Sequence, residues 1–143
     1  MVMTMAKKKI SNKLPPFVPM LWDMLNSKAY KDLPNSSKGL LPYFLGKVKL
    51  PIKSFEYYET TFSFSYAEAL KIGCARRTFY NVIQALMRNG FIDPVKKGGL
   101  KSDKLTMSYF RLSKRWKDYG LATFKKMEWR EFGQEQIRRS CGS

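Results

Sequence analysis

The clearest hydrophobic pattern in the chain lies between residues 65 and 89. In its second half, apolar side chains recur every three or four residues, and polar or basic side chains fill the positions between them. This spacing is typical of an α-helix that buries one face and exposes the other. The buried face is expected to carry Phe79, Val82, Ile83, Leu86 and Met87.

A shorter helix is predicted directly before this one. Ser65 precedes Glu68 at the spacing of a capping box, in which each side chain satisfies the other residue's free backbone N–H. Gly73 then suits the positive φ that ends a helix and turns the chain sharply. Residues 65–89 are therefore interpreted as a helix-turn-helix.

Short strands are predicted on both sides of this motif. The aromatic and β-branched residues 56–64 end in one strand, and residues 91–95 and 108–112 form two more. Gly98 and Gly99, together with several lysines, predict a basic hairpin tip between the last two strands. The predicted fold class is mostly α with a small β-hairpin, an α+β arrangement.

Two further helices are predicted in the N-terminal third of the chain. Residues 17–25 have apolar side chains at helical spacing, with Pro19 in the first turn. A second helix, capped by Asn35 or Ser36, should place leucines and Phe44 on one side, with Pro42 near a kink or boundary. The next segment is expected to be a loop.

The C-terminal third is expected to end in helices. Residues 114–120 predict a brief helix that Gly120 stops, and residues 123–139 predict a helix with weak amphipathicity. A chain of 143 residues fits one domain. We therefore expect three parts, which are a flexible basic N-terminal arm (1–16), the folded domain (17–119) and a C-terminal helical extension and tail (120–143).

The charge of the chain points to an anionic partner. It has 27 Lys and Arg against 11 Asp and Glu, a net charge of +16 at pH 7, and 44% hydrophobic residues. Such a composition places the charge on a folded body, where it attracts nucleic acids or anionic membrane surfaces. A solvated basic surface without a specific partner is the alternative. The sequence has neither a secretory signal nor an apolar run of about 20 residues, so we expect a cytoplasmic protein without a membrane span.

Residue types that enzymes need are scarce. The chain has no histidine, which excludes Ser-His triads and His-containing zinc sites. Cys74 and Cys141 lie far apart without metal-ligand spacing and are expected to be reduced thiols. A nuclease or recombinase with a tyrosine nucleophile is the enzymatic alternative, but the chain lacks clustered carboxylates for a metal. We expect no enzyme activity, cofactor, metal or small-molecule substrate.

The exposed face of the second helix carries residue types that bind nucleic acids. Arg bridges two acceptors of guanine, and Asn and Gln bridge N6 and N7 of adenine. The first turns of such a helix reach base edges, so the expected base-reading residues are Arg76, Arg77, Asn81 and Gln84. Phosphate or wing contacts are expected from Thr78, Tyr80, Arg88, Lys96, Lys97, Lys101 and Lys104. The alternatives are a merely solvated helix face and a flexible loop with solubilising lysines.

A resemblance to a known family is carried by the end of this helix. Residues 89–92, Asn-Gly-Phe-Ile, resemble the helix-to-wing junction of winged-helix proteins. Residues 77–92 are similar to the recognition segment of many winged-helix regulators and plasmid or phage replication initiators. Residues 27–33 and 109–116 resemble the segments that flank such domains, so the likeness covers about residues 17–119.

The resemblance implies a winged helix-turn-helix protein of a mobile element that binds double-stranded DNA. Together with the residues above, it predicts a transcription regulator or replication-initiation factor. Many such modules dimerise, here through residues 17–25 or the C-terminal helix. The family usually has Ser or Thr before the Arg pair, where this chain has Ala75, which costs roughly 1 kcal/mol of capping.

An RNA- or protein-binding module on the same scaffold is the alternative function. Exposed aromatic side chains before the first helix of the motif would stack on single-stranded bases, although such alternation is more often part of a core. The side chains in question are Tyr57, Tyr58, Phe62 and Phe64.

Overall fold

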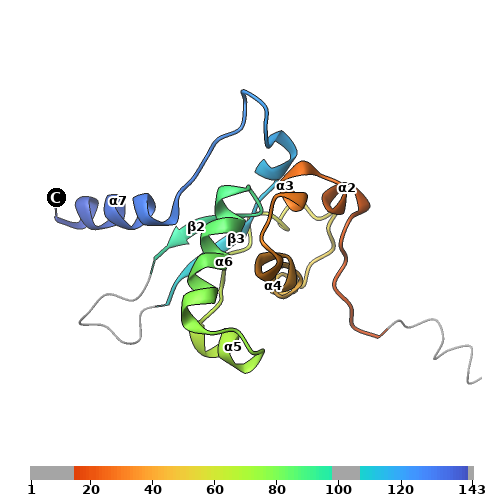
Figure 1. The fold of residues 1–143 in the computed structure, drawn as a ribbon, viewed down its shortest axis with the longest axis horizontal. Helices are drawn as coiled ribbons and strands as arrows, with labels where there is room; N and C mark the ends of the chain where they lie inside the picture. Colours follow the sequence, from red (N-terminus) through yellow and green to blue (C-terminus); the bar gives the residue numbers. More distant parts are fainter. Residues whose placement is uncertain (1–14, 98–106, 142–143) are drawn as a thin grey trace, which may run out of the picture.

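The computed structural model describes residues 15–97 and 107–141 (Figure 1). The described helices are α2 (Trp22–Leu25), α3 (Lys28–Lys31), α4 (Asn35–Leu45), α5 (Tyr66–Lys71), α6 (Arg76–Arg88), the 3-10 helix η1 (Arg115–Asp118) and α7 (Trp129–Cys141). The strands are β1 (Phe62–Ser63), β2 (Ile92–Lys96) and β3 (Tyr109–Leu112). The predicted α+β class is confirmed. The predicted hairpin tip and nearly all of the basic arm lie outside the described residues.

The strands form one antiparallel sheet in the order β1-β3-β2. Phe62 of β1 and Pro94 of β2 both lie opposite Phe110 of the central strand. Pro94 has no N–H to donate, which an edge strand such as β2 tolerates. All three predicted strands are therefore confirmed.

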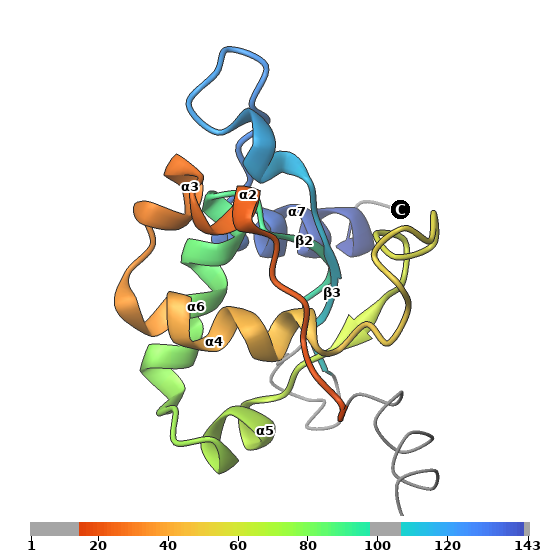
Figure 2. The same cartoon turned by 90° about the vertical axis from the view of Figure 1, so that its right-hand side faces the viewer.

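An aromatic cluster joins the helices to the sheet. The Phe44 ring centroid lies 4.6 Å from that of Phe64, 5.9 Å from that of Phe110 and 6.3 Å from that of Phe79. One ring of α4 thus contacts the segment before α5, the central strand and α6, and Figure 2 shows α4 crossing α6. The five apolar side chains predicted for the buried face of α6 are all buried, which confirms that face.

The start of α5 is the predicted capping box. Ser65 Oγ accepts a hydrogen bond from the Glu68 N–H at 3.1 Å, and Glu68 Oε1 accepts one from the Ser65 N–H at 2.9 Å. Lys47, which follows α4, also forms an ion pair with Glu68. Burial alone would raise the pKa of Glu68, but the hydrogen bonds from Lys47 and Ser65 outweigh it and lower the pKa.

The turn between α5 and α6 has the predicted geometry. Gly73 has a φ of +88°, a conformation that costs glycine little. Ala75 is the N-cap of α6 and makes no side-chain hydrogen bond there. The first turn of α6 therefore lacks the cap that Ser or Thr would supply.

The end of α6 is fixed by two adjacent residues. The Asn89 side-chain amide donates to the backbone carbonyl of Ala29 in α3 at 2.9 Å. Gly90 has a φ of +93°, and a Cβ there would lie 2.5 Å from the backbone nitrogen of Trp116. Both the conformation and the close approach of η1 therefore require glycine at this position.

The prediction of a helix over residues 17–25 is mostly wrong. Only α2 is helical, and Pro19 precedes it instead of lying in its first turn. Ser27 separates α2 from α3, because its hydroxyl donates to the Met24 carbonyl at 2.6 Å and accepts from the Tyr30 N–H at 3.1 Å. One side chain thus ends α2 and caps α3, a helix that the hydrophobic pattern did not predict.

The predicted cap of α4 is also wrong. Pro34 is the N-cap, and the helix begins at Asn35, so neither Asn35 nor Ser36 caps it. Pro34 has a φ that its ring fixes, and it makes no side-chain hydrogen bond to the helix. Pro42 lies inside the last turn of α4.

The C-terminal helix begins later than predicted. Residues 124–128 are not helical, and α7 starts at Trp129. The Lys125 carbonyl accepts a hydrogen bond from Arg115 at 2.8 Å, and the buried Trp129 ring lies 5.4 Å from that of Phe110. These contacts hold the segment before α7 against the domain, and the helix begins only after this segment. The brief helix predicted at residues 114–120 is η1, and Gly120 follows it with a φ of +87°.

Candidate nucleic-acid interface

The face of α6 turned away from the core is a strip of polar side chains. Arg77, Asn81 and Arg88 are exposed, and Gln84 is half-buried. These positions are separated by three or four residues, so the side chains lie along one line of the helix. Tyr80 stands beside the strip with 38% of its surface exposed. The sequence predicted this arrangement because it follows from the buried positions alone.

Arg76 is directed away from this strip. Its guanidinium carbon lies 4.5 Å from the ring centroid of Tyr66 in α5. A cation over an aromatic ring at an exposed site contributes about 0.5 to 1 kcal/mol. Arg76 therefore bridges the two helices, whereas Arg77 shares the exposed strip with Asn81.

Arg88, predicted to contact phosphate, pairs with a carboxylate of the C-terminal extension. Its Nε and Nη2 donate to the two oxygens of Glu128 at 3.2 and 3.3 Å. Lys126 lies 3.6 Å from the same carboxylate. The hydrogen bond from Arg88 is the main cause that lowers the pKa of Glu128. The far end of the strip is thus attached to residues that precede α7.

Lys97, at the base of the predicted hairpin, packs against α7. Its ammonium lies 5.0 Å from the ring centroid of Trp129, and its side chain crosses Gly133 so closely that a Cβ there would lie 2.7 Å from Lys97 Cδ. The Lys97 N–H donates to Gln136 Oε1 at 3.0 Å, and Gln136 Nε2 donates to the Lys97 carbonyl at 2.8 Å. Burial, and then the charge of Arg130, lower the pKa of Lys97.

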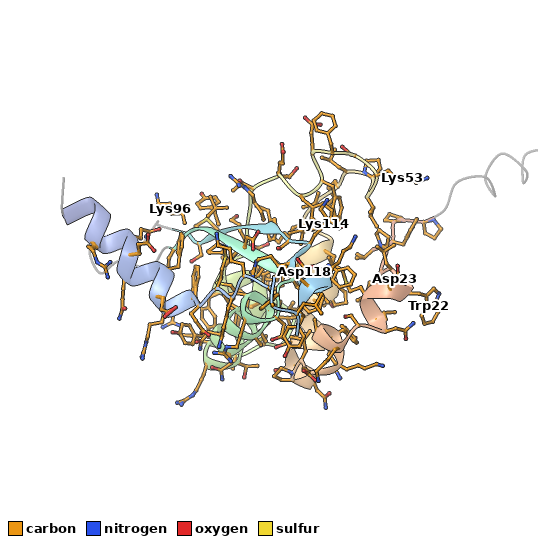
Figure 3. The ribbon with its side chains drawn as sticks, turned by 90° about the horizontal axis from the view of Figure 1, so that it is seen from above. Trp22, Asp23, Lys53, Lys96, Lys114 and Asp118 are labelled. Carbon is orange, nitrogen blue, oxygen red and sulfur yellow. The ribbon has the colours of Figure 1, made fainter. Side chains whose placement is uncertain are left out.

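The other predicted contact residues differ in their surroundings. Lys96 is exposed at the end of β2, and Figure 3 places it near α7, on the opposite side of the molecule from Lys53. Thr78 is half-buried. Lys101 and Lys104 lie outside the described residues, so their predicted phosphate contacts remain predictions.

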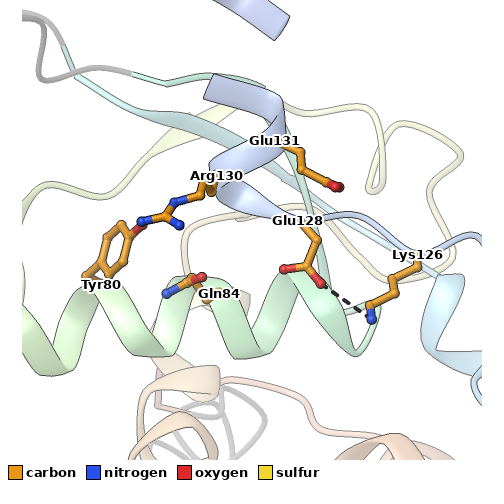
Figure 4. A pocket seen from close by; sticks show the side chains of 6 residues that line it. All are labelled: Tyr80, Gln84, Lys126, Glu128, Arg130 and Glu131. Atoms are coloured by element: carbon orange, nitrogen blue, oxygen red, sulfur yellow. Dashed lines mark ion pairs between the residues drawn. The ribbon is translucent and has the colours of Figure 1, made fainter. Parts of the chain in front are cut away.

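An open pocket of about 650 Å³ lies between α6 and the start of α7 (Figure 4). Tyr80 and Gln84 line it from α6, and four charged side chains line it from the other side: Lys126, Glu128, Arg130 and Glu131. These four side chains were not among the residues predicted from the sequence. Trp129 was the available signal, since tryptophan side chains are highly buried on average and one in a charged segment indicates a contact with the core.

Arg115 connects the elements that carry this site. Its guanidinium donates to Asp93 at 2.6 Å, and to the carbonyls of Met87 and Ile92 at 2.9 Å each. Only 13% of its side chain is exposed. It therefore joins the end of α6, strand β2 and, through the Lys125 carbonyl, the chain leading into α7.

Other types of site have little support within the described residues. In that part of the chain, no group of three or more His, Cys, Asp or Glu side chains could hold a metal ion. Cys74 is a free, buried thiol whose pKa is raised by burial. The Cys141 side chain is not among those that the structure describes, so its reduced state stays a prediction. None of the described helices is long and apolar enough to cross a membrane.

The chain has no match among protein families, curated proteins or solved structures.

Proposed function

We propose that the chain binds double-stranded DNA sequence-specifically, with α6 as the recognition helix in the major groove. The observation that carries this proposal is the strip formed by Arg77, Asn81 and Gln84 on a helix whose opposite face is buried. These side chains are of the types that form paired hydrogen bonds with guanine and adenine edges. The net charge of +16 supplies the sequence-independent attraction to phosphate.

The order of elements supports a winged helix-turn-helix. A capped α5, a glycine turn, α6 and then the antiparallel β2 and β3 follow one another as such a domain requires. In this proposal, β2, β3 and their connection form the wing. Lys96 extends from the base of the wing toward solvent and is the described wing lysine that remains most accessible to a phosphate.

The structure suggests different roles for the predicted contact residues. Arg77 and Asn81 are the strongest candidates for base contacts, because they are exposed in the first turns of α6. Arg76 is a candidate for a backbone contact, because its guanidinium is held over Tyr66. Arg88 orients the C-terminal extension through Glu128, so we expect its mutation to affect stability more than base discrimination.

The RNA-binding alternative has lost its main support. Tyr57, Phe62 and Phe64 are buried in the core and offer no ring face for stacking on bases. Tyr58 is half-buried and lies against Tyr57 and Lys114. The resemblance to winged-helix proteins favours transcription regulation or replication initiation as the biological role, with a homodimer as the proposed assembly.

Selection of bound fragments from a random duplex pool tests this proposal. We expect enrichment of one short motif, and a repeat of that motif about one or two helical turns away if the protein binds as a dimer. Retention of duplex without any enrichment would contradict sequence-specific readout. Preferential retention of RNA from a matched pool would favour the alternative function.

A further inference from the structure

The start of α7 brings a second cation to the base of the proposed wing. Lys97 crosses α7 at Trp129 and Gly133, with its ammonium over the Trp129 ring, and Arg130 lies between these two residues in the sequence. Burial is the main cause that lowers the pKa of Lys97, and the charge of Arg130 contributes to it. Two cations from different elements are thus held near each other.

The nearby carboxylates do not compensate this pair. Glu128 accepts hydrogen bonds from Arg88 and lies against Lys126. Figure 4 shows the Glu131 side chain directed toward the Lys126 side of the pocket, whereas Arg130 extends the other way, toward Tyr80 and over Gln84. Arg130 is exposed and makes no ion pair with a carboxylate in the described part of the chain.

Two neighbouring cations repel each other unless an anion lies between or above them. Arg130 also borders the exposed strip of α6, beside Tyr80 and Gln84. A recognition helix in the major groove is flanked by the phosphates of the groove edges. The position of Arg130 on the flanking helix therefore suits a phosphate better than a base edge.

We propose that Arg130, with Lys97 beside it, forms a binding site for a backbone phosphate of the DNA, and that α7 is the second wall of the DNA-binding face. This inference rests on the proposed function. It assigns to the C-terminal extension a contact that lies outside the helix-turn-helix and the wing tip.

The test compares single-arginine variants of the full chain on a labelled duplex of about 20 base pairs carrying the enriched motif. Arg130→Ala should raise Kd about 5- to 10-fold and reduce the slope of log Kd against log salt by about 1. Arg138→Ala removes the same charge from an exposed position of the same helix. It should change Kd less than about twofold. Arg130→Lys should stay near wild type, because a phosphate needs the charge more than the guanidinium fork.

Equal Kd values for Arg130→Ala and Arg138→Ala would overturn the phosphate site. Arg130→Lys binding as weakly as Arg130→Ala would overturn the assignment to phosphate. Arg77→Ala separates this inference from the proposed function: if it weakens binding while Arg130→Ala does not, only the inference fails. If the wild-type chain does not bind duplex, both fail.

Discussion

At the scale of single residues, Gly90 and Gly39 show how differently two glycines can contribute. Gly90 combines a φ of +93° with a backbone approach that leaves no room for a Cβ. Gly39 lies in the middle of α4, and nothing would lie within 4 Å of a Cβ there. The first glycine fixes the end of α6 against η1, and the second only weakens a helix.

These surroundings predict opposite effects of the same substitution. Gly90→Ala should lower the free energy of unfolding by more than about 2 kcal/mol, because positive φ and a steric clash act together. Gly39→Ala should raise it by about 0.5 to 1 kcal/mol, because alanine favours an exposed helix interior. Urea denaturation measures both. An unchanged free energy of unfolding in Gly90→Ala would show that η1 does not approach the end of α6 this closely.

Glu68 makes part of the stability depend on pH. Its pKa is lower in the folded protein than its ordinary value, so its carboxylate stabilises the fold above the unfolded-state pKa. This contribution is lost as the pH falls through the folded-state pKa. The free energy of unfolding of wild type should therefore drop between about pH 5 and pH 3.

Glu68→Gln should flatten that part of the pH profile and lower stability at neutral pH. Glu56→Gln, at an exposed loop position before β1, is the matched control and should leave the profile unchanged. Thermal unfolding at several pH values measures the effect. Identical profiles for wild type and Glu68→Gln would contradict a role for the Lys47 and Ser65 contacts.

At the scale of elements, the edge of β2 is continued by a side chain of α7. The Gln136 amide pairs with both backbone groups of Lys97, as a neighbouring strand would. No strand pairs with this edge of β2 in the described sheet. The C-terminal helix therefore fixes the position where the chain leaves the sheet for the hairpin.

Removal of this amide should loosen the base of the hairpin without unfolding the domain. Gln136→Ala is expected to accelerate hydrogen exchange of the Lys97 amide about 5- to 10-fold, because its acceptor is lost. Gln134→Ala, an exposed position on the same helix, should leave that amide protected. Exchange followed by NMR separates the two. Unchanged protection in Gln136→Ala would mean that α7 does not hold this edge.

The elements that the sequence predicted are those with local signals. Periodicity, the capping box and Gly73 were sufficient for α5, α6 and the turn between them. At the N-terminal end a second local signal was missed: the Ser27 hydroxyl bonds to Met24 and Tyr30, three residues away on either side, and separates α2 from α3. At the C-terminal end, contacts between residues further apart decided the outcome, because Arg115 binds the Lys125 carbonyl and Trp129 packs on Phe110. A hydrophobic pattern contains neither kind of information, because the Ser27 contacts are polar and the partners of Arg115 and Trp129 lie in other elements.

At the scale of the whole molecule, the proposed DNA-binding face combines three elements, which are α6, β2 and α7. The strip of α6 was predictable from its own sequence, but the approach of α7 to it was not. The Arg88 and Glu128 pair and the Lys97 contacts bring the C-terminal extension beside α6 and β2. We therefore expect base discrimination from the first half of α6 and phosphate affinity from the surrounding cations.

The most direct test of the central claim is the ratio of Kd values for the enriched duplex and a scrambled duplex. Wild type should discriminate between them by at least about 100-fold. The double variant Arg77→Ala with Asn81→Ala should lose most of this ratio and keep most of its affinity for the scrambled duplex. Lys53→Ala, which removes an exposed charge far from α6, should keep the ratio. If the double variant discriminates as well as wild type, α6 does not read the bases and the account is wrong.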